Sequence, residues 1–149
     1  MVKEIVFERF DEEWAGKLVG RTSTQGIDGF LGVTVMEFTA GRLVAGFEAR
    51  TELITPLGNM HGGCLSALID HCLGVIMYPV MPPGYWAATT EFKINLLAPV
   101  SGGTCTATAQ IRNMTRRLAV VTIEVENAGR PVALAQGTCA IVAPRPSSG

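Results

Sequence analysis

One long apolar segment restricts the folds open to this chain more than any other feature. Residues 62–78 predict a helix with apolar side chains on most of its circumference, ended by Pro79. At 1.5 Å per residue it would be roughly 25 Å long. Such a helix is stable inside a fold rather than on its surface, so the rest of the chain must cover it.

The cover that the sequence predicts is a β-sheet. Two strand-like runs, 31–38 and 43–49, precede the helix and form a hairpin through a short turn. After the helix the apolar period changes to two, and short turns between the runs imply antiparallel neighbours. Four consecutive strands are expected there, around residues 91–96, 104–111, 118–125 and 132–142.

These elements predict a single α+β domain over residues 1–149. A curved, six-stranded antiparallel sheet would wrap around the long central helix, because the sheet has one apolar face to cover. Residues 1–29 are expected to be an N-terminal helical segment, since apolar residues recur at helical spacing over 7–18. Residues 143–149 would be a loose tail.

Composition excludes several classes of protein. With 12 Lys+Arg and 13 Asp+Glu, the chain lacks the basic field of a nucleic-acid binder. The apolar stretch 72–88 is a poor membrane span, because three prolines and a glycine interrupt it. Four cysteines without a CxxC pair, and a charged N-terminus without a secretory signal, predict reduced thiols and a cytoplasmic location.

A lone carboxylate lies within the apolar helix. Among residues 61–90, the side chains that can carry a charge are those of His61, Asp70 and His71. A carboxylate in apolar surroundings costs free energy unless it is paired or used. The neighbours of Asp70 three and four residues away offer no cation, so a structural partner would have to come from elsewhere. A functional role for the acid is therefore favoured over a structural one.

Small residues share the helix face of Asp70 and would leave space beside it. They are Gly63, Ser66, Ala67 and Gly74. The first-turn N–H groups of Gly62 and Gly63 have no intrahelical acceptor and lie at the positive end of the helix dipole. Unshielded by side chains, they could polarise a carbonyl oxygen. The alternative is a tight turn into the helix, and the same turn would build the site.

The stretch His61-Gly62-Gly63, followed by Leu68-Ile69-Asp70, resembles the signature of the hotdog-fold acyl-CoA thioesterases of the PaaI type. Residues 95–99, ending in Pro99, and Gln136-Gly137 resemble two further strands of that family. The similarity covers roughly residues 30–142. It implies a long helix wrapped by an antiparallel sheet, assembled as homodimers or homotetramers with shared active sites.

The resemblance also implies a reaction, the hydrolysis of an acyl-CoA or aryl-CoA to CoA and a carboxylic acid. Gly62 would supply the oxyanion N–H, and Asp70 would act as general base or nucleophile. Thr89 is the better match to a hydroxyl that orients the water, and Thr90 is the second. CoA enters as part of the substrate, so no cofactor or metal is expected.

Further residues complete the expected site. Thr55 stands where many family members have an Asn or Gln that binds the thioester carbonyl, which is a departure from the pattern. His61 would contact the thioester or steady the loop through a structural hydrogen bond. Gly63 and Ser66 are expected to contact the substrate.

Arg116 and Arg117 lie in a turn between two predicted strands. In similar proteins the matching turn carries basic residues near the CoA phosphates, and the guanidinium group suits phosphate geometry. A simple solvated turn is the alternative.

Other kinds of chemistry fit the sequence less well. His71 adjoins Asp70 and so does not face it, while Cys64 and Ser66 have no base in register. A G-x-S-x-G motif is absent, and the His and Cys residues lack a standard metal-ligand spacing. Two rivals remain: a non-catalytic acyl-CoA binding or sensing module on the same fold, and a hotdog dehydratase, whose motif is missing.

Overall fold

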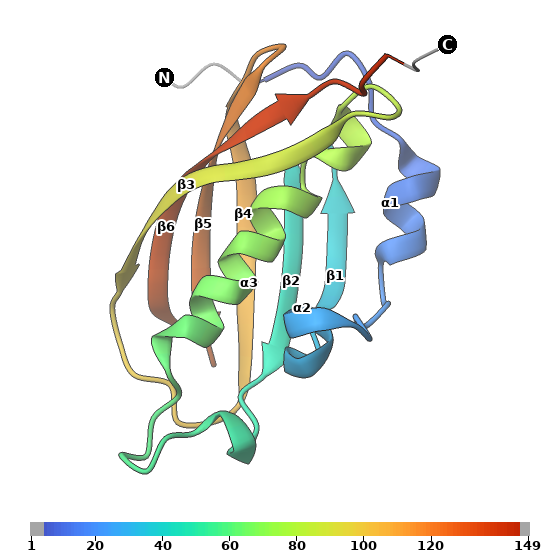
Figure 1. Ribbon diagram of the computed structural model, residues 1–149. Coiled ribbons are helices and arrows are strands. Elements are labelled where there is room, and N and C mark those ends of the chain that lie inside the picture. Colours follow the sequence, from blue (N-terminus) through green and yellow to red (C-terminus); the bar gives the residue numbers. More distant parts are fainter. Residues whose placement is uncertain (1–4, 147–149) are drawn as a thin grey trace.

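The structure is a computed structural model, and it describes residues 5–146. A six-stranded antiparallel sheet curves around the central helix α3, Gly62–Val75, as Figure 1 shows. This is the hotdog fold that the sequence predicts. The short N-terminal helix α1, Glu12–Leu18, lies at the side of the molecule.

The six strands follow the predicted order along the chain with changes of boundary. The remaining elements are α2 (Gly26–Leu31), β1 (Thr34–Thr39), β2 (Arg42–Glu48), the 3-10 turns η1 (Thr51–Leu53) and η2 (Tyr78–Val80), β3 (Trp86–Leu96), β4 (Thr104–Met114), β5 (Leu118–Asn127) and β6 (Arg130–Val142).

One pair of consecutive strands departs from the prediction. The strands lie in the order β1-β2-β4-β5-β6-β3, so β3 pairs with β6 and not with β4. The expectation that every short turn joins neighbouring strands is wrong for residues 97–103. This connection instead crosses the end of the fold at which α3 begins, where the Met60 N–H donates to the Val100 carbonyl at 2.7 Å. The crossing leaves β3 at the edge of the sheet.

Both predicted helices are shorter than expected, for local reasons. The N-terminal helix begins at Glu12, because Asp11 caps it by accepting the Trp14 N–H at 2.9 Å. The central helix ends at Val75, and the chain then tightens into 3-10 geometry at η2, which contains Pro79.

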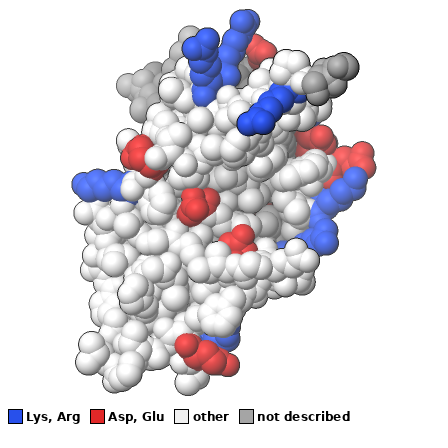
Figure 2. Space-filling model, viewed as in Figure 1, with Lys and Arg blue, Asp and Glu red and all other residues white. Residues whose placement is uncertain are grey.

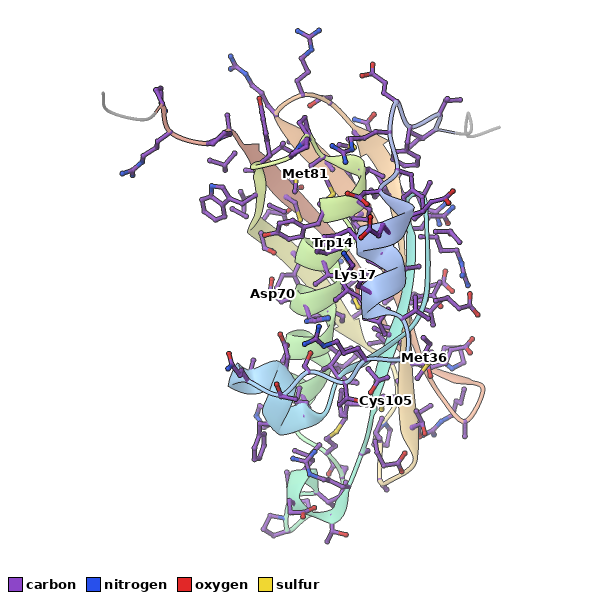
Figure 3. The ribbon with its side chains drawn as sticks, turned by 90° about the vertical axis from the view of Figure 1, so that its right-hand side faces the viewer. Trp14, Lys17, Met36, Asp70, Met81 and Cys105 are labelled. Atoms are coloured by element: carbon purple, nitrogen blue, oxygen red, sulfur yellow. The ribbon has the colours of Figure 1, made fainter. Side chains whose placement is uncertain are left out.

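The core forms where α3 meets the concave face of the sheet. Its inward side chains are fully buried: Leu65, Leu68, Ile69, Cys72 and Leu73. The Cys139 thiol on β6 donates to the Leu73 carbonyl at 3.2 Å. At the far end of α3, Trp14 stacks on Tyr78 with ring centroids 5.5 Å apart (Figure 3). The core therefore fixes the rotation of α3 about its own axis.

All four cysteines are free in this structure. Burial raises the pKa of Cys72 to about 12 and that of Cys105 to about 11. Since the thiolate is the reactive form, these two thiols are unreactive packing groups at neutral pH.

The segment Gly62–Val80 is long and apolar enough to cross a membrane by length and composition. Half of its most apolar window is buried inside the fold. A core helix meets the same test, so this property is weak evidence for a membrane span.

Gly137 on β6 lies where a Cβ atom would meet the Leu73 side chain at 2.8 Å and the Glu91 carbonyl oxygen at 3.0 Å. We expect Gly137→Ala to destabilise the fold by about 1–3 kcal/mol, because overpacking forces backbone shifts. Urea unfolding measures the change. Gly16→Ala is the control, since nothing lies within 4 Å of a Cβ there and alanine favours the helix. Equal unfolding midpoints for the two variants would contradict the expectation.

Candidate functional site

Asp70 projects from α3 on the side away from the sheet, as Figure 3 shows. Its helix neighbours Ile69 and Leu73 are buried, whereas Asp70 itself is exposed. The expectation of an acid in apolar surroundings is therefore wrong for a single chain: the sheet covers the opposite side of the helix. The small residues Ser66 and Gly74 beside it are also only partly covered.

Thr89 lies on the edge strand β3, next to α3 in the fold. It pairs in register with Cys139, whose side chain faces α3 and bonds the Leu73 carbonyl. Burial raises the pKa of the Cys139 thiol, a hydrogen bond with Thr89 lowers it, and the negative charge of Asp70 raises it. Thr89 therefore shares with Cys139 the sheet face that packs against α3.

Thr90 faces elsewhere. The β3–β6 register shifts between Thr89 and Glu91, and the Thr90 hydroxyl donates to the Thr138 carbonyl at 2.9 Å. Because of this irregularity, the side chains of the two adjacent threonines have different surroundings. Thr89 is the one placed toward α3.

The first turn of α3 leaves one N–H group open. The His61 Nδ1 atom accepts the Gly63 N–H at 2.8 Å, so this donor is not available to a substrate. The Gly62 N–H has no acceptor within residues 5–146. Of the two donors predicted from the sequence, the structure therefore leaves that of Gly62 free.

Side chains lie close to both glycine positions. A Cβ on Gly62 would lie 2.5 Å from a methyl carbon of Leu96, and one on Gly63 would lie 2.8 Å from the His61 ring. The glycines let His61 fold back over the helix end as its N-cap.

Two hydroxyl groups near this helix end already make local bonds. Thr55 lies in the loop before α3 and accepts the Leu57 N–H at 3.3 Å, which leaves its own proton free to donate. Ser66 donates to the Gly62 carbonyl at 3.2 Å.

Arg116 and Arg117 are exposed in the β4–β5 turn, at the opposite end of the fold from Gly62 (Figure 1). Thr115 shapes this turn by accepting the N–H groups of Arg117 and Leu118 at 3.2 and 3.1 Å. Figure 2 shows basic side chains gathered at this end. Within one chain the two arginines do not meet the helix N-terminus.

Helix α2 is a part of the site region that the sequence did not predict. Its Asp28 carboxylate lies 2.9 Å from Nδ1 of His71, the residue after Asp70, while Nε2 of that ring is buried without a partner in the described part of the chain. Arg50 holds the other end of α2 by donating to the Phe30 and Leu31 carbonyls. With six residues α2 is too short for apolar periodicity, and its C-terminal Gly32, at φ 74°, was the available signal.

Over residues 5–146, no group of three or more His, Cys, Asp or Glu side chains is placed to hold a metal ion.

Comparison with known proteins places the site in a family context. The model of the thioesterase superfamily matches residues 57–134, which include Gly62, Asp70, Thr89 and the β4–β5 turn. No curated protein matches the chain.

Several solved structures have the same fold. A thioesterase from Haemophilus influenzae is 19% identical with a TM-score of 0.79, and the alignment covers all of both chains. A mutant thioesterase from Pseudomonas aeruginosa is 24% identical with a TM-score of 0.77, covering 89% of this chain and 94% of that one. A phenylacetic acid degradation-related protein from Ralstonia eutropha is 25% identical with a TM-score of 0.72, covering 76% and 88%.

The contact between His71 and Asp28 predicts a measurable stabilisation. We expect Asp28→Ala to lower the free energy of unfolding by about 1–3 kcal/mol, because it leaves both nitrogens of a largely buried imidazole unpaired. Urea unfolding at neutral pH checks this. Glu13→Ala breaks the exposed Lys17–Glu13 pair and is the control, with an expected loss below about 1 kcal/mol. A loss no larger than that of the control would mean that α2 is held by other contacts.

Proposed function

This chain belongs to the thioesterase superfamily, and on that premise we propose that it hydrolyses an acyl-CoA or aryl-CoA thioester to CoA and a carboxylic acid. The observation that carries the proposal is that each copy of α3 presents both an open Gly62 N–H at its start and an exposed Asp70 carboxylate further along. Together they supply an electrophilic contact and a base, which acyl transfer to water requires.

In the proposed mechanism the thioester carbonyl oxygen accepts the Gly62 N–H, at the positive end of the α3 dipole. Asp70 takes a proton from water held by Thr89, or attacks the carbonyl carbon itself; both routes need the same carboxylate. The tetrahedral intermediate then collapses and the C–S bond breaks. On the general-base route CoA leaves as the thiol with the proton that Asp70 took from water, and the carboxylic acid is released directly. On the nucleophilic route CoA leaves as the thiolate, which solvent protonates, and water then hydrolyses the mixed anhydride on Asp70 to the carboxylic acid and the free carboxylate. No cofactor takes part.

The geometry of α3 supports a site shared between subunits. Gly62 and Asp70 are eight residues apart, which is about 12 Å along a helix. An oxyanion donor and a base must each reach one carbonyl group within hydrogen-bond distance, so one chain does not supply both. The proposed site therefore takes Gly62 from one subunit and Asp70 from another.

The edge strand β3 offers a surface for this assembly. Within residues 5–146 it pairs with β6 alone, so its other edge carries free backbone donors and acceptors. Pairing of β3 with a second copy would give a homodimer and would cover the exposed Asp70. In that dimer or a tetramer, we propose that Arg116 and Arg117 of a neighbouring subunit bind the CoA phosphates.

The other predicted residues take supporting roles in this proposal. Thr55 has a free hydroxyl proton for the thioester carbonyl, and His61 holds the Gly62 turn through its cap. Gly63, Ser66 and Thr90 remain predicted substrate contacts, limited by the hydrogen bonds that they already make.

Asp70→Asn tests the base. We expect kcat to fall by about a hundredfold to ten-thousandfold, because the amide neither accepts the proton from water nor attacks the carbonyl. The measurement is free thiol released from a panel of short-chain, long-chain and aryl-CoA thioesters. Glu124→Gln, the same change at an exposed acid on β5, is the control and should leave the rate unchanged. Unchanged hydrolysis by Asp70→Asn would refute the mechanism, and binding of the thioesters without cleavage by the native protein would support a sensing module.

Gly62→Pro tests the oxyanion contact. Proline lacks the N–H group and suits the first position of a helix, and His61 has the extended φ of −63° and ψ of 133° that a residue before proline needs. We expect a loss in kcat of about a hundredfold to a thousandfold relative to Gly62→Ala. The alanine variant is the matched control, because it brings the same Cβ against Leu96 but keeps the N–H.

Mixing the two inactive variants then tests whether sites are shared. Asp70→Asn and Gly62→Pro chains, unfolded and refolded together, should recover about a quarter of the native activity. Random pairing makes half of the dimers mixed, and each mixed dimer has one intact site. Mixed dimers without recovered activity would show that both groups act from one subunit or that one of the two roles is wrong.

A further inference from the structure

A cavity of about 720 Å³ lies at the end of the fold away from the N-terminus of α3. Its lining combines residues 5–9 with Val80 at the end of η2, Tyr85, Met114 at the end of β4 and Ile141 on β6. Ligand pockets commonly have volumes of about 300–1,000 Å³. Neither Asp70 nor Gly62 lines this cavity.

The N-terminal part of this lining is fixed in place, although it is an extended segment where the sequence predicts a helix. The Phe7 ring packs on Gly41 in the β1–β2 turn so closely that a Cβ at Gly41 would overlap it. The Asp11 N–H donates to the Pro79 carbonyl at 2.9 Å, which joins the end of this segment to η2. The cavity is therefore a built feature of the fold.

The lining combines apolar side chains with a cation. Phe7, Tyr85 and Met114 supply aromatic and flexible apolar surface, and Arg116, an exposed side chain, also lines the cavity. Figure 2 shows further basic side chains at this end of the molecule. Apolar walls beside a guanidinium group suit a ligand with an apolar body and an anionic head.

The charges favour a singly charged head over a polyphosphate. Arg9 also lines the cavity, but its guanidinium group forms an ion pair with the Asp11 carboxylate at 3.4 Å. Glu8 adds a negative charge to the same lining. Of the two arginines that line the cavity, Arg116 has no carboxylate partner within residues 5–146. We propose that this cavity binds a carboxylic acid with an apolar chain or ring, held by Arg116. The proposal does not depend on the hydrolytic role of Asp70. In it Arg116 holds a carboxylate when no CoA is bound, so an acid in the cavity and a CoA phosphate would compete for this side chain.

Calorimetric titration of the native protein with decanoate tests the proposal, with decanol and decyltrimethylammonium as neutral and cationic probes. We expect decanoate to bind about tenfold or more tightly than either, because a charge-assisted hydrogen bond contributes about 1.5–3 kcal/mol. No CoA is present, so the phosphate-binding role proposed for the arginine pair does not enter. Equal binding of decanoate and decanol would overturn the proposal.

Two variants locate the bound acid. Arg116→Gln should weaken decanoate binding about tenfold, whereas Arg117→Gln, the adjacent exposed arginine that does not line the cavity, should not change it. Met114→Trp should fill the cavity and weaken binding further, with circular dichroism confirming that the variant is folded. If Arg116→Gln and Arg117→Gln behaved alike, or if decanoate bound Met114→Trp as tightly as the native protein, the site would lie elsewhere and the proposal would be wrong.

Discussion

The packing of α3 against the concave face of the sheet is the constraint on which the other features depend. Five of its side chains, including Leu68 and Ile69, are fully buried, and Cys139 bonds the Leu73 carbonyl. These contacts fix how the helix is rotated. Because they do, the stripe of small residues and Asp70 must face away from the sheet, and the first turn must present the Gly62 N–H at one end. The position of the candidate site is thus a consequence of the core.

The sequence predicted the features that follow from periodicity and from local chemistry. The apolar helix, the strands of period two and the hairpin before the helix are all present, since each is specified by side-chain spacing within its own segment. The features that depend on distant partners were missed. The exposure of Asp70 depends on which helix face the sheet covers, and the pairing of β3 with β6 depends on a connection whose path short-range rules do not describe.

The residues of the candidate site also divide into those that local sequence patterns predict and those that depend on contacts with distant residues. Gly62, Asp70 and Thr89 were predicted as site residues because motif spacing and family resemblance point to them. The hydrogen bond from the Gly63 N–H to the His61 side chain was not predicted. It depends on the rotamer of His61, which residue spacing does not determine. Helix α2 was missed because its stability comes from Arg50 and His71, which are distant in sequence.

The strand order has a further consequence for the way the molecule forms. Strand β3 is made before β4 and β5 during synthesis, but its partner β6 is the last strand of the sheet. Until residues 130–142 emerge, Thr89 has no sheet to hold it, and the strand that we propose as the subunit edge remains unpaired. In the order of synthesis, the edge that completes the proposed active site is therefore among the last parts of the sheet to find its partner.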